Sequence, residues 1–506
     1  MKNHLFYTVL LTLLVVGSLL GLSKLPTITI GEHTLRAVDI LADVKSSSSK
    51  GQDSLPIIEL KELDELTGLL DSTDLFAQDT LENSSLNELA ESSEATDTTT
   101  VNEQVTLQRI YPNKTWQSID TNEEGLTYIV DYSENQSRGM GPFYEALNKV
   151  EEGKFARIAV FGDSFIEGDI FTVDLRSYLQ SEYGGLGVGY VPITSATNGF
   201  RPSVIHTFNG WNSHSVTDKS GFKYNQQGIA GYYFVPVEEN AFVELRGQKR
   251  YAQHLDTCEV ASIFFKTSKP LSLTTRLNGG EERFFEIEES QDLQAVQVEG
   301  DIGRIRWTTP KDSLALFYGV AMDGRQGIVL DNFSLRGSSG YSLLSIPESN
   351  LKEFNALRSY DLIILQYGLN VVADGVYDYN YYRIQMNKVI AYLKKCFPNT
   401  GFLLLSVGDR DYKTADGTYE TMPEIKYFLQ IQRQIAKDCK IAFWNMFEAM
   451  GGENSMYDLV HDNPSKANYD YTHINFRGGR FMAKKLFESI VDGKIKYNKG
   501  EIYAGE

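Results

Sequence analysis

Short apolar runs alternate with helical patterns over much of the chain. The apolar, β-prone runs lie at residues 158–161, within 360–370, at 402–406 and at 441–444. The helical patterns 381–397 and 423–439 lie between the later runs. Strands without a polar face are typical of parallel sheets that helices cover on both sides. The pattern therefore predicts an α/β domain built on a parallel sheet.

The stretch 201–331 has a different period. Apolar and polar residues alternate there over short segments that Gly, Asn and Asp separate. These segments are 231–237, 241–245, 261–265, 271–277, 284–287, 304–307 and 314–318. Many short alternating strands predict a β-sandwich or a jelly roll. We therefore expect a β domain at 201–331, inserted into an α/β domain that 106–200 and 332–506 form together.

The amino terminus is apolar and uncharged from residue 5 to residue 23. As a helix this run would be about 28 Å long, enough to cross a bilayer core of about 30 Å. Lys2 precedes the run, Lys24 ends it, and no Ala-x-Ala cleavage site follows. We expect residues 1–24 to be an uncleaved transmembrane signal anchor rather than a removed signal peptide, with the rest of the chain exported.

Residues 25–105 are rich in Ser, Thr, Asp and Glu, which predicts a flexible spacer. From residue 52 to residue 103 there are 14 acidic residues and one basic residue, Lys61, so 13 of the 19 net negative charges lie here. The remainder of the chain is only mildly acidic. This distribution argues against nucleic acid and against an anionic bilayer surface as partners, so we expect membrane contact through residues 1–24 only.

Cysteines and histidines show no pattern of a disulfide framework or a metal site. The three cysteines are Cys258, Cys396 and Cys439, and the histidines at 206, 214, 254 and 461 are scattered without a His-x-x-x-His pair. We expect buried thiols, with a Cys396–Cys439 disulfide as the alternative. We expect no metal and no cofactor.

Candidate chemistry begins at Ser164, in the tripeptide Gly162-Asp163-Ser164 directly after the run 158–161. Glycine permits a tight turn where a side chain would clash. Active sites of open α/β sheets lie at the carboxyl ends of strands, which is where this serine stands. Because the tripeptide also occurs in ordinary turns, its partners must decide whether Ser164 is a nucleophile.

The segment Asp470-Tyr471-Thr472-His473 offers such partners, just ahead of a helical pattern. An Asp three residues before a His can reach its Nδ1 and fix the tautomer in which Nε2 takes a serine proton. We therefore interpret His473 as the general base and Asp470 as its orienting acid, with Ser164 as the nucleophile. The alternative is a structural histidine at the start of a helix.

Two further segments carry candidate hydrogen-bond donors. The run within 360–370 ends in Gly-x-Asn, and the side-chain amide of Asn370 can donate to an oxyanion. The glycine-bearing loop 335–340 offers a backbone N–H that no large side chain screens. Together with the N–H of Ser164, these groups would form an oxyanion hole. Ordinary turns explain each segment when it is taken alone.

Taken together, the four segments resemble the blocks of the SGNH hydrolases, also called the GDSL esterase and lipase superfamily. The residues that match the Ser, Gly, Asn and His of the blocks are Ser164, Gly337, Asn370 and His473. The resemblance implies a three-layer, flavodoxin-like fold, with Ser164 N–H, Gly337 N–H and the Asn370 amide as oxyanion donors. It covers about residues 140–200 and 335–495 and departs at Val371, where the family usually has Asp.

The inserted domain resembles that of peptidoglycan O-acetylesterases, in which a carbohydrate-binding-like β-sandwich interrupts the SGNH domain. This resemblance implies an acetylated glycan as the substrate. The alternative is that the insert only supports the rim of the active site. Aromatic residues of the insert are expected either in its core or stacked on sugar rings, and the candidates are Trp211, Trp307, Tyr232 and Tyr233.

We therefore expect an exported serine esterase, anchored in the inner membrane, that removes O-acetyl groups from a cell-envelope polysaccharide such as peptidoglycan. The reaction would proceed through an acyl-enzyme on Ser164. Two alternatives remain open. The same residues would serve an O-acetyltransferase if water is excluded from the acyl-enzyme. The chain would instead be a glycan-binding protein if the SGNH scaffold has lost its catalytic activity. The sequence specifies neither the position of the acetyl group nor the oligomeric state.

Overall fold

The structure is a computed structural model that describes residues 28–30, 33–35, 118–218 and 221–501. The chain divides into two units, Met1–Glu94 and Ala95–Glu506. In the first unit, the described residues form an antiparallel pair of strands, β1 (Ile28–Ile30) and β2 (His33–Leu35). The anchor expected at 1–24 and most of the spacer expected at 25–105 lie outside the described residues. Within the described residues, no helix has the length and apolar character that crossing a bilayer requires.

The second unit is built on a six-stranded sheet with the order β16-β4-β17-β18-β21-β3. All neighbouring strands pair in parallel except β3, which runs antiparallel at one edge. The strands are β16 (Gly327–Ser334), β4 (Phe155–Gly162), β17 (Leu362–Gln366), β18 (Gly401–Leu405), β21 (Ala442–Trp444) and β3 (Ile129–Asp131). The predicted parallel sheet is confirmed, whereas β3 was not predicted from the sequence.

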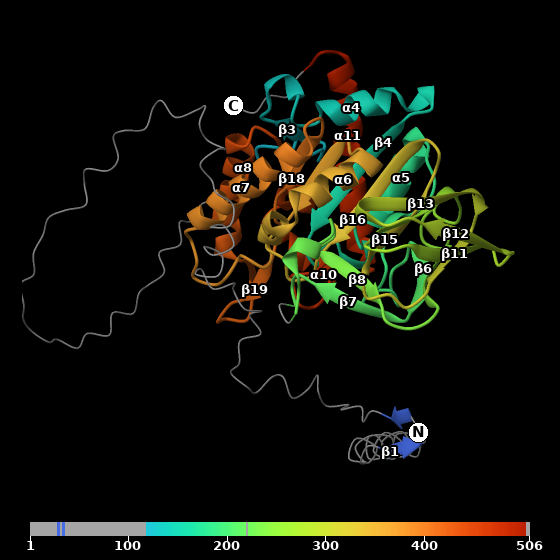
Figure 1. The fold of residues 1–506 in the computed structure, drawn as a ribbon. Helices are drawn as coiled ribbons and strands as arrows, with labels where there is room; N and C mark the ends of the chain where they lie inside the picture. The colour runs from blue at the N-terminus through green and yellow to red at the C-terminus, as the bar shows by residue number, and fades with distance from the viewer. Residues whose placement is uncertain (1–27, 31–32, 36–117, 219–220, 502–506) are drawn as a thin grey trace, which may run out of the picture. The chain divides into compact units, whose positions relative to one another are not determined.

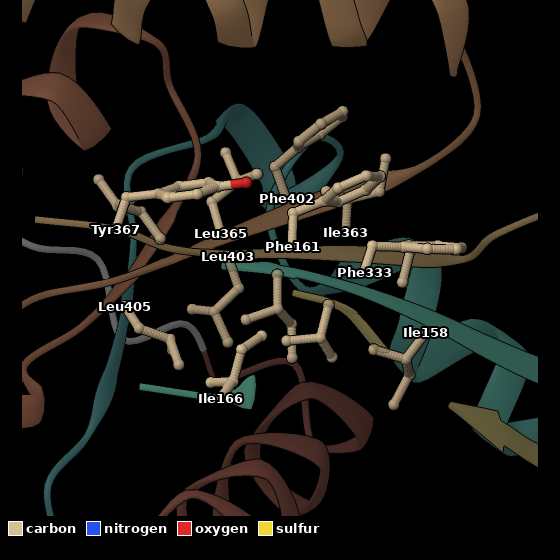
Figure 2. Close-up of a cluster of buried hydrophobic side chains, with 14 of the residues drawn as sticks. Ile158, Phe161, Ile166, Phe333, Ile363, Leu365, Tyr367, Phe402, Leu403 and Leu405 are labelled. Atoms are coloured by element: carbon tan, nitrogen blue, oxygen red, sulfur yellow. The ribbon is translucent and has the colours of Figure 1, made fainter. Parts of the chain in front are cut away.

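Helices lie above and below this sheet (Figure 2). The helix α5 packs against α11, and α7 packs against both α6 and α8. Figure 1 shows α7 and α8 next to each other. The helices are α4 (Gly141–Asn148), α5 (Thr172–Tyr183), α6 (Glu348–Arg358), α7 (Asn380–Cys396), α8 (Pro423–Asp438), α9 (Met446–Met450), α10 (Ser455–His461) and α11 (Phe476–Asn498). Short 3-10 helices are η1 (Glu134–Gln136), η2 (Val150–Glu152), η3 (Glu167–Asp169), η4 (Tyr224–Gln226) and η5 (Tyr341–Ser345). The predicted helices 381–397 and 423–439 agree with α7 and α8 to within one residue.

Side chains on both faces of the parallel sheet are buried. Figure 2 shows Phe161, Ile363 and Phe402 on one side of the strands, and Ile158 and Leu403 on the other. All of these side chains are shielded from solvent almost completely. Burial on two faces explains why these strands are apolar at successive positions instead of alternating.

The inserted segment forms two antiparallel sheets, β13-β10-β15-β8-β7 with β5 also paired to β15, and β12-β11-β14-β9-β6. The strands are β5 (Gly189–Pro192), β6 (Val204–Asn209), β7 (Trp211–Ser215), β8 (Tyr232–Pro236), β9 (Ala241–Gly247), β10 (Cys258–Thr267), β11 (Leu271–Leu277), β12 (Glu282–Ile287), β13 (Ser290–Ile302), β14 (Arg304–Thr309) and β15 (Ala315–Asp323). Side chains of both sheets share one hydrophobic core, with Ile263 and Phe317 from the first sheet and Leu273 and Trp307 from the second. The predicted antiparallel insert is confirmed, and its jelly-roll connectivity stays a prediction.

The borders of the insert differ from the predicted range 201–331. Strand β5 precedes that range yet pairs with β15 of the insert, and β16 begins inside the range yet belongs to the parallel sheet. The run that forms β16 carries two adjacent polar residues, Asp331 and Asn332, after its first apolar residues. Asp331 accepts hydrogen bonds from Arg358, and Asn332 donates to the carbonyl of Ile166. These polar side chains are buried and paired, which sequence alone does not distinguish from exposure to solvent.

The insert is fastened to helix α6 of the α/β part. Lys266 of β10 forms an ion pair with Glu353 at 2.7 Å, and Glu353 also accepts the backbone N–H of Leu293 at 3.0 Å. Asn350 donates to the carbonyl of Gln227 at 2.7 Å. These contacts make the insert part of one compact unit.

Candidate active site

Ser164 stands just beyond the carboxyl end of β4. The last residue of that strand, Gly162, is flanked by Ser334 of β16 and Gln366 of β17. A Cβ atom added at Gly162 would lie 2.8 Å from the carbonyl oxygen of Gln366, so only glycine permits this close approach. The serine that follows is half-buried and sits between the ends of the two neighbouring strands.

The structure brings the three predicted catalytic side chains together. Ser164 Oγ lies 3.3 Å from His473 Nε2, and His473 Nδ1 lies 2.9 Å from Asp470 Oδ2. Asp470 also accepts the backbone N–H groups of Thr472 and His473 at 3.0 Å each, which fixes the turn that carries both residues. With Nδ1 donating to the carboxylate, Nε2 is left to accept the proton of the serine hydroxyl.

Asp470 is ionised under ordinary conditions. Partial burial raises the pKa of Asp470, but hydrogen bonds from the His473 side chain and from two backbone N–H groups outweigh it and lower the pKa to about 2. A carboxylate that stays charged is what an imidazole needs when it becomes an imidazolium. Both groups are open to solvent, with 48% of the Asp470 side chain and 39% of the His473 side chain exposed.

The two other predicted oxyanion donors lie in the loops that follow the strands flanking β4. Gly337 is in the turn after β16, with a positive φ of 75°, and Asn370 follows β17. Because parallel strands end at one edge of a sheet, both residues lie at the edge that carries Ser164. The turn around Gly337 is closed by a hydrogen bond from Ser338 N–H to the carbonyl of Leu335 at 3.1 Å.

The amide of Asn370 already has two partners. Its Nδ2 donates to Asp163 Oδ2 at 3.2 Å and to the carbonyl of Ser338 at 3.1 Å. An amide nitrogen carries two hydrogens, so both are engaged in this arrangement. Donation to an oxyanion therefore requires that one of these bonds exchange for the new one.

Asp163 is a site residue that the sequence reasoning missed. Its side chain is fully buried and accepts the backbone N–H of Phe165 at 2.9 Å. Burial raises the pKa of Asp163 to about 7, against the opposing effects of the Phe165 N–H, the charge of His473 and the Asn370 amide. Its place between the glycine of the turn and the nucleophile was a signal in the sequence, but nothing there revealed the contact with Asn370.

Arg410 adds a cation beside the catalytic acid. Its guanidinium donates to the carbonyl of Val372 at 3.4 Å. Burial lowers the pKa of Arg410, and the negative charge of Asp470 opposes that effect. The sequence places Arg410 at a strand-to-loop junction, where it would either hold a sugar or peptide carboxylate or belong to a solvated loop.

A cavity of about 280 Å³ lies where the insert meets the loop after Ser164. Glu167 and Ser334 line it from the α/β part, and Thr194, Ser213 and Tyr232 line it from the segments around the insert. Among the four aromatic candidates of the insert, Tyr232 alone lines this cavity. Trp307 and Tyr233 are core residues, and the Trp211 ring packs against Phe317 while its N–H donates to the carbonyl of Phe242.

The three cysteines are free thiols in the structure. Cys258 and Cys396 are buried, and Cys439 is half-buried. Within 118–218 and 221–501, no three His, Cys, Asp or Glu side chains are grouped in a way that would hold a metal ion.

No protein-family model matches the sequence, and no curated protein matches it. Solved structures do match. A peptidoglycan O-acetylesterase has a TM-score of 0.60 and 20% sequence identity, over 73% of this chain and 99% of that chain. A family two carbohydrate esterase from Clostridium thermocellum, in complex with cellohexaose, has a TM-score of 0.24 and 12% identity over 58% of this chain and 99% of that chain. An acetyl xylan esterase has a TM-score of 0.25 and 19% identity over 32% of this chain and 81% of that chain.

Only the first of these likenesses is strong enough to carry a conclusion, and at 20% identity the conclusion concerns the fold. The parallel sheet and the Ser164–His473–Asp470 hydrogen bonds at its carboxyl edge match what the sequence predicted for this fold. The chain therefore has the SGNH/GDSL hydrolase fold, interrupted by two antiparallel sheets.

Proposed function

We propose that the chain is a serine esterase that removes O-acetyl groups from a cell-envelope polysaccharide, with peptidoglycan as its substrate. The observation that carries this proposal is the chain of hydrogen bonds from Ser164 through His473 to Asp470 at the carboxyl edge of the sheet. An activated serine in this setting performs acyl transfer through a covalent intermediate.

In the first half of the reaction, Ser164 Oγ attacks the ester carbonyl carbon while His473 Nε2 takes the hydroxyl proton. The carbonyl oxygen becomes negatively charged, and the N–H groups of Ser164 and Gly337 stabilise it together with an Asn370 N–H released from Asp163 or Ser338. The bond between the carbonyl carbon and the sugar oxygen then breaks. His473 gives its proton to that oxygen, and the deacetylated sugar leaves.

In the second half, water attacks the acetyl group on Ser164 while His473 takes a proton from the water. The bond to Ser164 Oγ breaks, the serine regains its proton and acetate leaves. Asp470 stays charged throughout because hydrogen bonds keep its pKa at about 2. It therefore stabilises the imidazolium at both stages without accepting the proton itself.

Solvent access favours hydrolysis over the alternative of an O-acetyltransferase. The two activities share the acyl-enzyme and differ in whether water or a sugar hydroxyl attacks it. With 39% of its side chain exposed, His473 is open to the water molecule that hydrolysis needs. A transferase has to keep water from this position.

The choice of substrate rests on the likeness in fold to a peptidoglycan O-acetylesterase, together with the inserted sheets. Export and anchoring in the inner membrane through residues 1–24 belong to the same proposal, because they would bring the esterase to the side of the membrane where this polymer lies.

The test compares acetate release from O-acetylated peptidoglycan and from an acetylated plant polysaccharide, using the full-length chain in detergent. Release from peptidoglycan should disappear in Ser164→Ala and persist in Ser181→Ala, a control in which the lost hydroxyl bonds only within helix α5. Release from the plant polymer alone would overturn the substrate. Labelling of Ser164 by a fluorophosphonate without any release would overturn hydrolysis, and the absence of labelling would favour a glycan-binding protein.

A further inference from the structure

Aromatic side chains gather around the turn that carries the catalytic acid and base. They come from three separate segments: strand β20 (Tyr419–Thr421), which pairs with β19 (Asp411–Lys413), helix α10, and the catalytic turn itself. Figure 1 shows β19 and α10 at the same end of this unit, and α10 contacts β20. We call this group the tyrosine platform, and its members are Tyr419, Tyr457, His461, Tyr469 and Tyr471.

Tyr471 is the buried member of the platform. Its ring stacks on that of Tyr419 with centroids 4.0 Å apart, and its hydroxyl lies 3.0 Å from His461 Nε2. Its backbone has a positive φ of 53°, which is unfavourable for a residue with a large side chain. Strain of this kind persists only where surrounding contacts impose it, and here those contacts hold the residue next to Asp470.

Tyr457 and Tyr469 form the exposed edge of the platform. The ring of Tyr457 lies 4.2 Å from that of His461 and is within 18° of parallel to the ring of Tyr471. The rings of Tyr469 and His461 are nearly perpendicular, with their centroids 6.3 Å apart. Tyr469 is 77% exposed and Tyr457 is 37% exposed.

Exposed tyrosines in this position are poorly explained by packing. Aromatic side chains contribute to a core when they are buried, and Tyr469 leaves most of its surface in water. A tyrosine combines a flat apolar face with a hydroxyl at its rim, which suits the apolar face and the hydroxyl edge of a sugar ring. Tyr469 and Tyr471 are the chain neighbours of Asp470, so the platform adjoins the turn that carries Asp470 and His473.

We propose that Tyr457 and Tyr469 form a sugar-stacking subsite, which holds a ring of the glycan strand next to the acetylated sugar. The inference rests on the proposed esterase function, because the scissile ester is then carried by a sugar whose neighbours in the polymer are further sugar rings. The occupant is therefore the glycan strand itself rather than its peptide stems. The subsite belongs to the α/β part of the chain, apart from the inserted sheets.

The experiment measures two substrates with the full-length chain, O-acetylated peptidoglycan and 4-nitrophenyl acetate. The small ester is too short to reach the platform, so it reports on the catalytic groups alone. Tyr469→Ala and Tyr457→Ala should each raise KM for peptidoglycan roughly three- to tenfold, the range expected for one lost aromatic contact. Both variants should leave kcat/KM for 4-nitrophenyl acetate within about twofold of the parent, because Ser164 and His473 are untouched.

Two variants make the comparison specific. Tyr469→Phe keeps the ring and should restore the KM of the parent for peptidoglycan. Tyr251→Ala removes a tyrosine of the insert that is 48% exposed. It should leave both KM for peptidoglycan and kcat/KM for 4-nitrophenyl acetate unchanged. Tyr469→Ala is the decisive variant, since among the ring pairs of the described residues the Tyr469 ring has His461 alone as a partner.

An unchanged KM for peptidoglycan in Tyr469→Ala would overturn the subsite, as would an equal loss on both substrates, which marks a structural role. Failure of the parent to act on peptidoglycan would overturn the proposed function and leave the subsite to a binding measurement. There, Ser164→Ala is titrated with a soluble β-1,4-linked N-acetylglucosamine tetramer, with and without Tyr469→Ala. Weaker binding in the double variant supports the subsite, and equal binding or none by either protein overturns it.

Discussion

The loop that follows β4 holds two carboxylates in opposite states at its two ends. Asp163, beside the nucleophile, and Asp169, at the end of η3, are six residues apart and both fully buried. Burial alone raises the pKa of any carboxyl group. The pKa of Asp163 is raised to about 7, whereas that of Asp169 lies well below its ordinary value.

The partners of the two groups explain the difference. Burial opposes ionisation of Asp169, but the guanidinium groups of Arg201 and Arg176 lie 2.9 Å and 3.4 Å away and hold it charged. Ser203, Thr172 and Asn332 add hydrogen bonds to the same carboxylate. Asp169 thereby ties the loop to helix α5, to the start of the insert and to β16.

Asp163 has amides where Asp169 has cations. Its hydrogen-bond donors are the backbone N–H groups of Phe165 and Gly368 and the side-chain amide of Asn370. Dipoles compensate burial less well than full charges do, so the proton stays bound up to neutral pH. The same loop therefore has a permanently charged structural end and an end at the catalytic centre whose charge changes with pH.

The largest effect should come from Asp169→Asn. The substitution keeps the volume but leaves two buried guanidinium groups without their counter-charge, which should lower the free energy of unfolding by about 3–5 kcal/mol. Urea unfolding at pH 5 measures it. Asp163→Asn at the same pH is the matched control, because it replaces a carboxyl group that is already neutral there, and equal losses in the two variants would contradict the comparison.

The next effect is a dependence of stability on pH. A carboxyl group whose pKa is raised on folding stabilises the protein while it is protonated in both states, and this stabilisation is lost as pH rises through the folded pKa. For Asp163, the free energy of unfolding should fall by about 3 kcal/mol between pH 4 and pH 7.5, relative to Asp163→Asn. Unfolding curves of both proteins across this range test the prediction, and parallel pH profiles would refute it.

Asn370→Ala tests the catalytic end by activity. Removing one oxyanion donor should lower kcat for 4-nitrophenyl acetate by about 100-fold while the fold is retained. Asn380→Ala is the control, because the Asn380 amide bonds to Asp378 at the start of α7. A loss in Asn370→Ala below threefold would show that the Asn370 amide stays with Asp163 and Ser338 during the reaction.

Ser203→Ala should give the smallest effect. Its hydroxyl donates to Asp169 and accepts from Arg201 Nε, which also donates to Asp169 directly. Because Arg201 keeps its bond to the carboxylate, the lost hydroxyl should lower the free energy of unfolding by only about 1.5 kcal/mol. Two arginines still compensate the carboxylate, so the loss stays well below that of Asp169→Asn. Urea unfolding of Ser203→Ala, with Ser181→Ala as the control, measures this decrease in the free energy of unfolding. A decrease as large as that of Asp169→Asn would show that the Ser203 hydroxyl, rather than the arginines, stabilises the charge of Asp169.

The sequence predicted the features of the fold and site that are local. Apolar runs identified β4, β17, β18 and β21. These strands are buried on both faces, so they are apolar at successive positions and easily recognised in the sequence. Asp470 and His473 are three residues apart, so their hydrogen bond follows from the length of one turn. Ser164 was identified because the tripeptide Gly162-Asp163-Ser164 follows an apolar run and because Asp470 and His473 offered partners.

Contacts between segments that lie far apart in the chain could not be predicted from the sequence. Asp163 and Asn370 are separated by 207 positions, and nothing in either segment indicates that they meet. Strand β13 was not predicted, because it is rich in Gln, Asp and Glu. It is the edge strand of its sheet, and much of it faces solvent. The tyrosine platform combines three segments, so neither its existence nor its exposure follows from any one of them.

The insertion between two neighbouring strands sets an order of assembly. Strand β4 ends at Gly162 and its sheet neighbour β16 starts at Gly327, so the ribosome makes the whole insert between them. Closing so long a loop is entropically unfavourable until the intervening chain has folded, and pairing of β5 with β15 then brings β16 back to β4. A nascent chain that carries Ser164 thus lacks the turn around Gly337 and the base His473, and it stays inert until the segment that carries His473 has also been made.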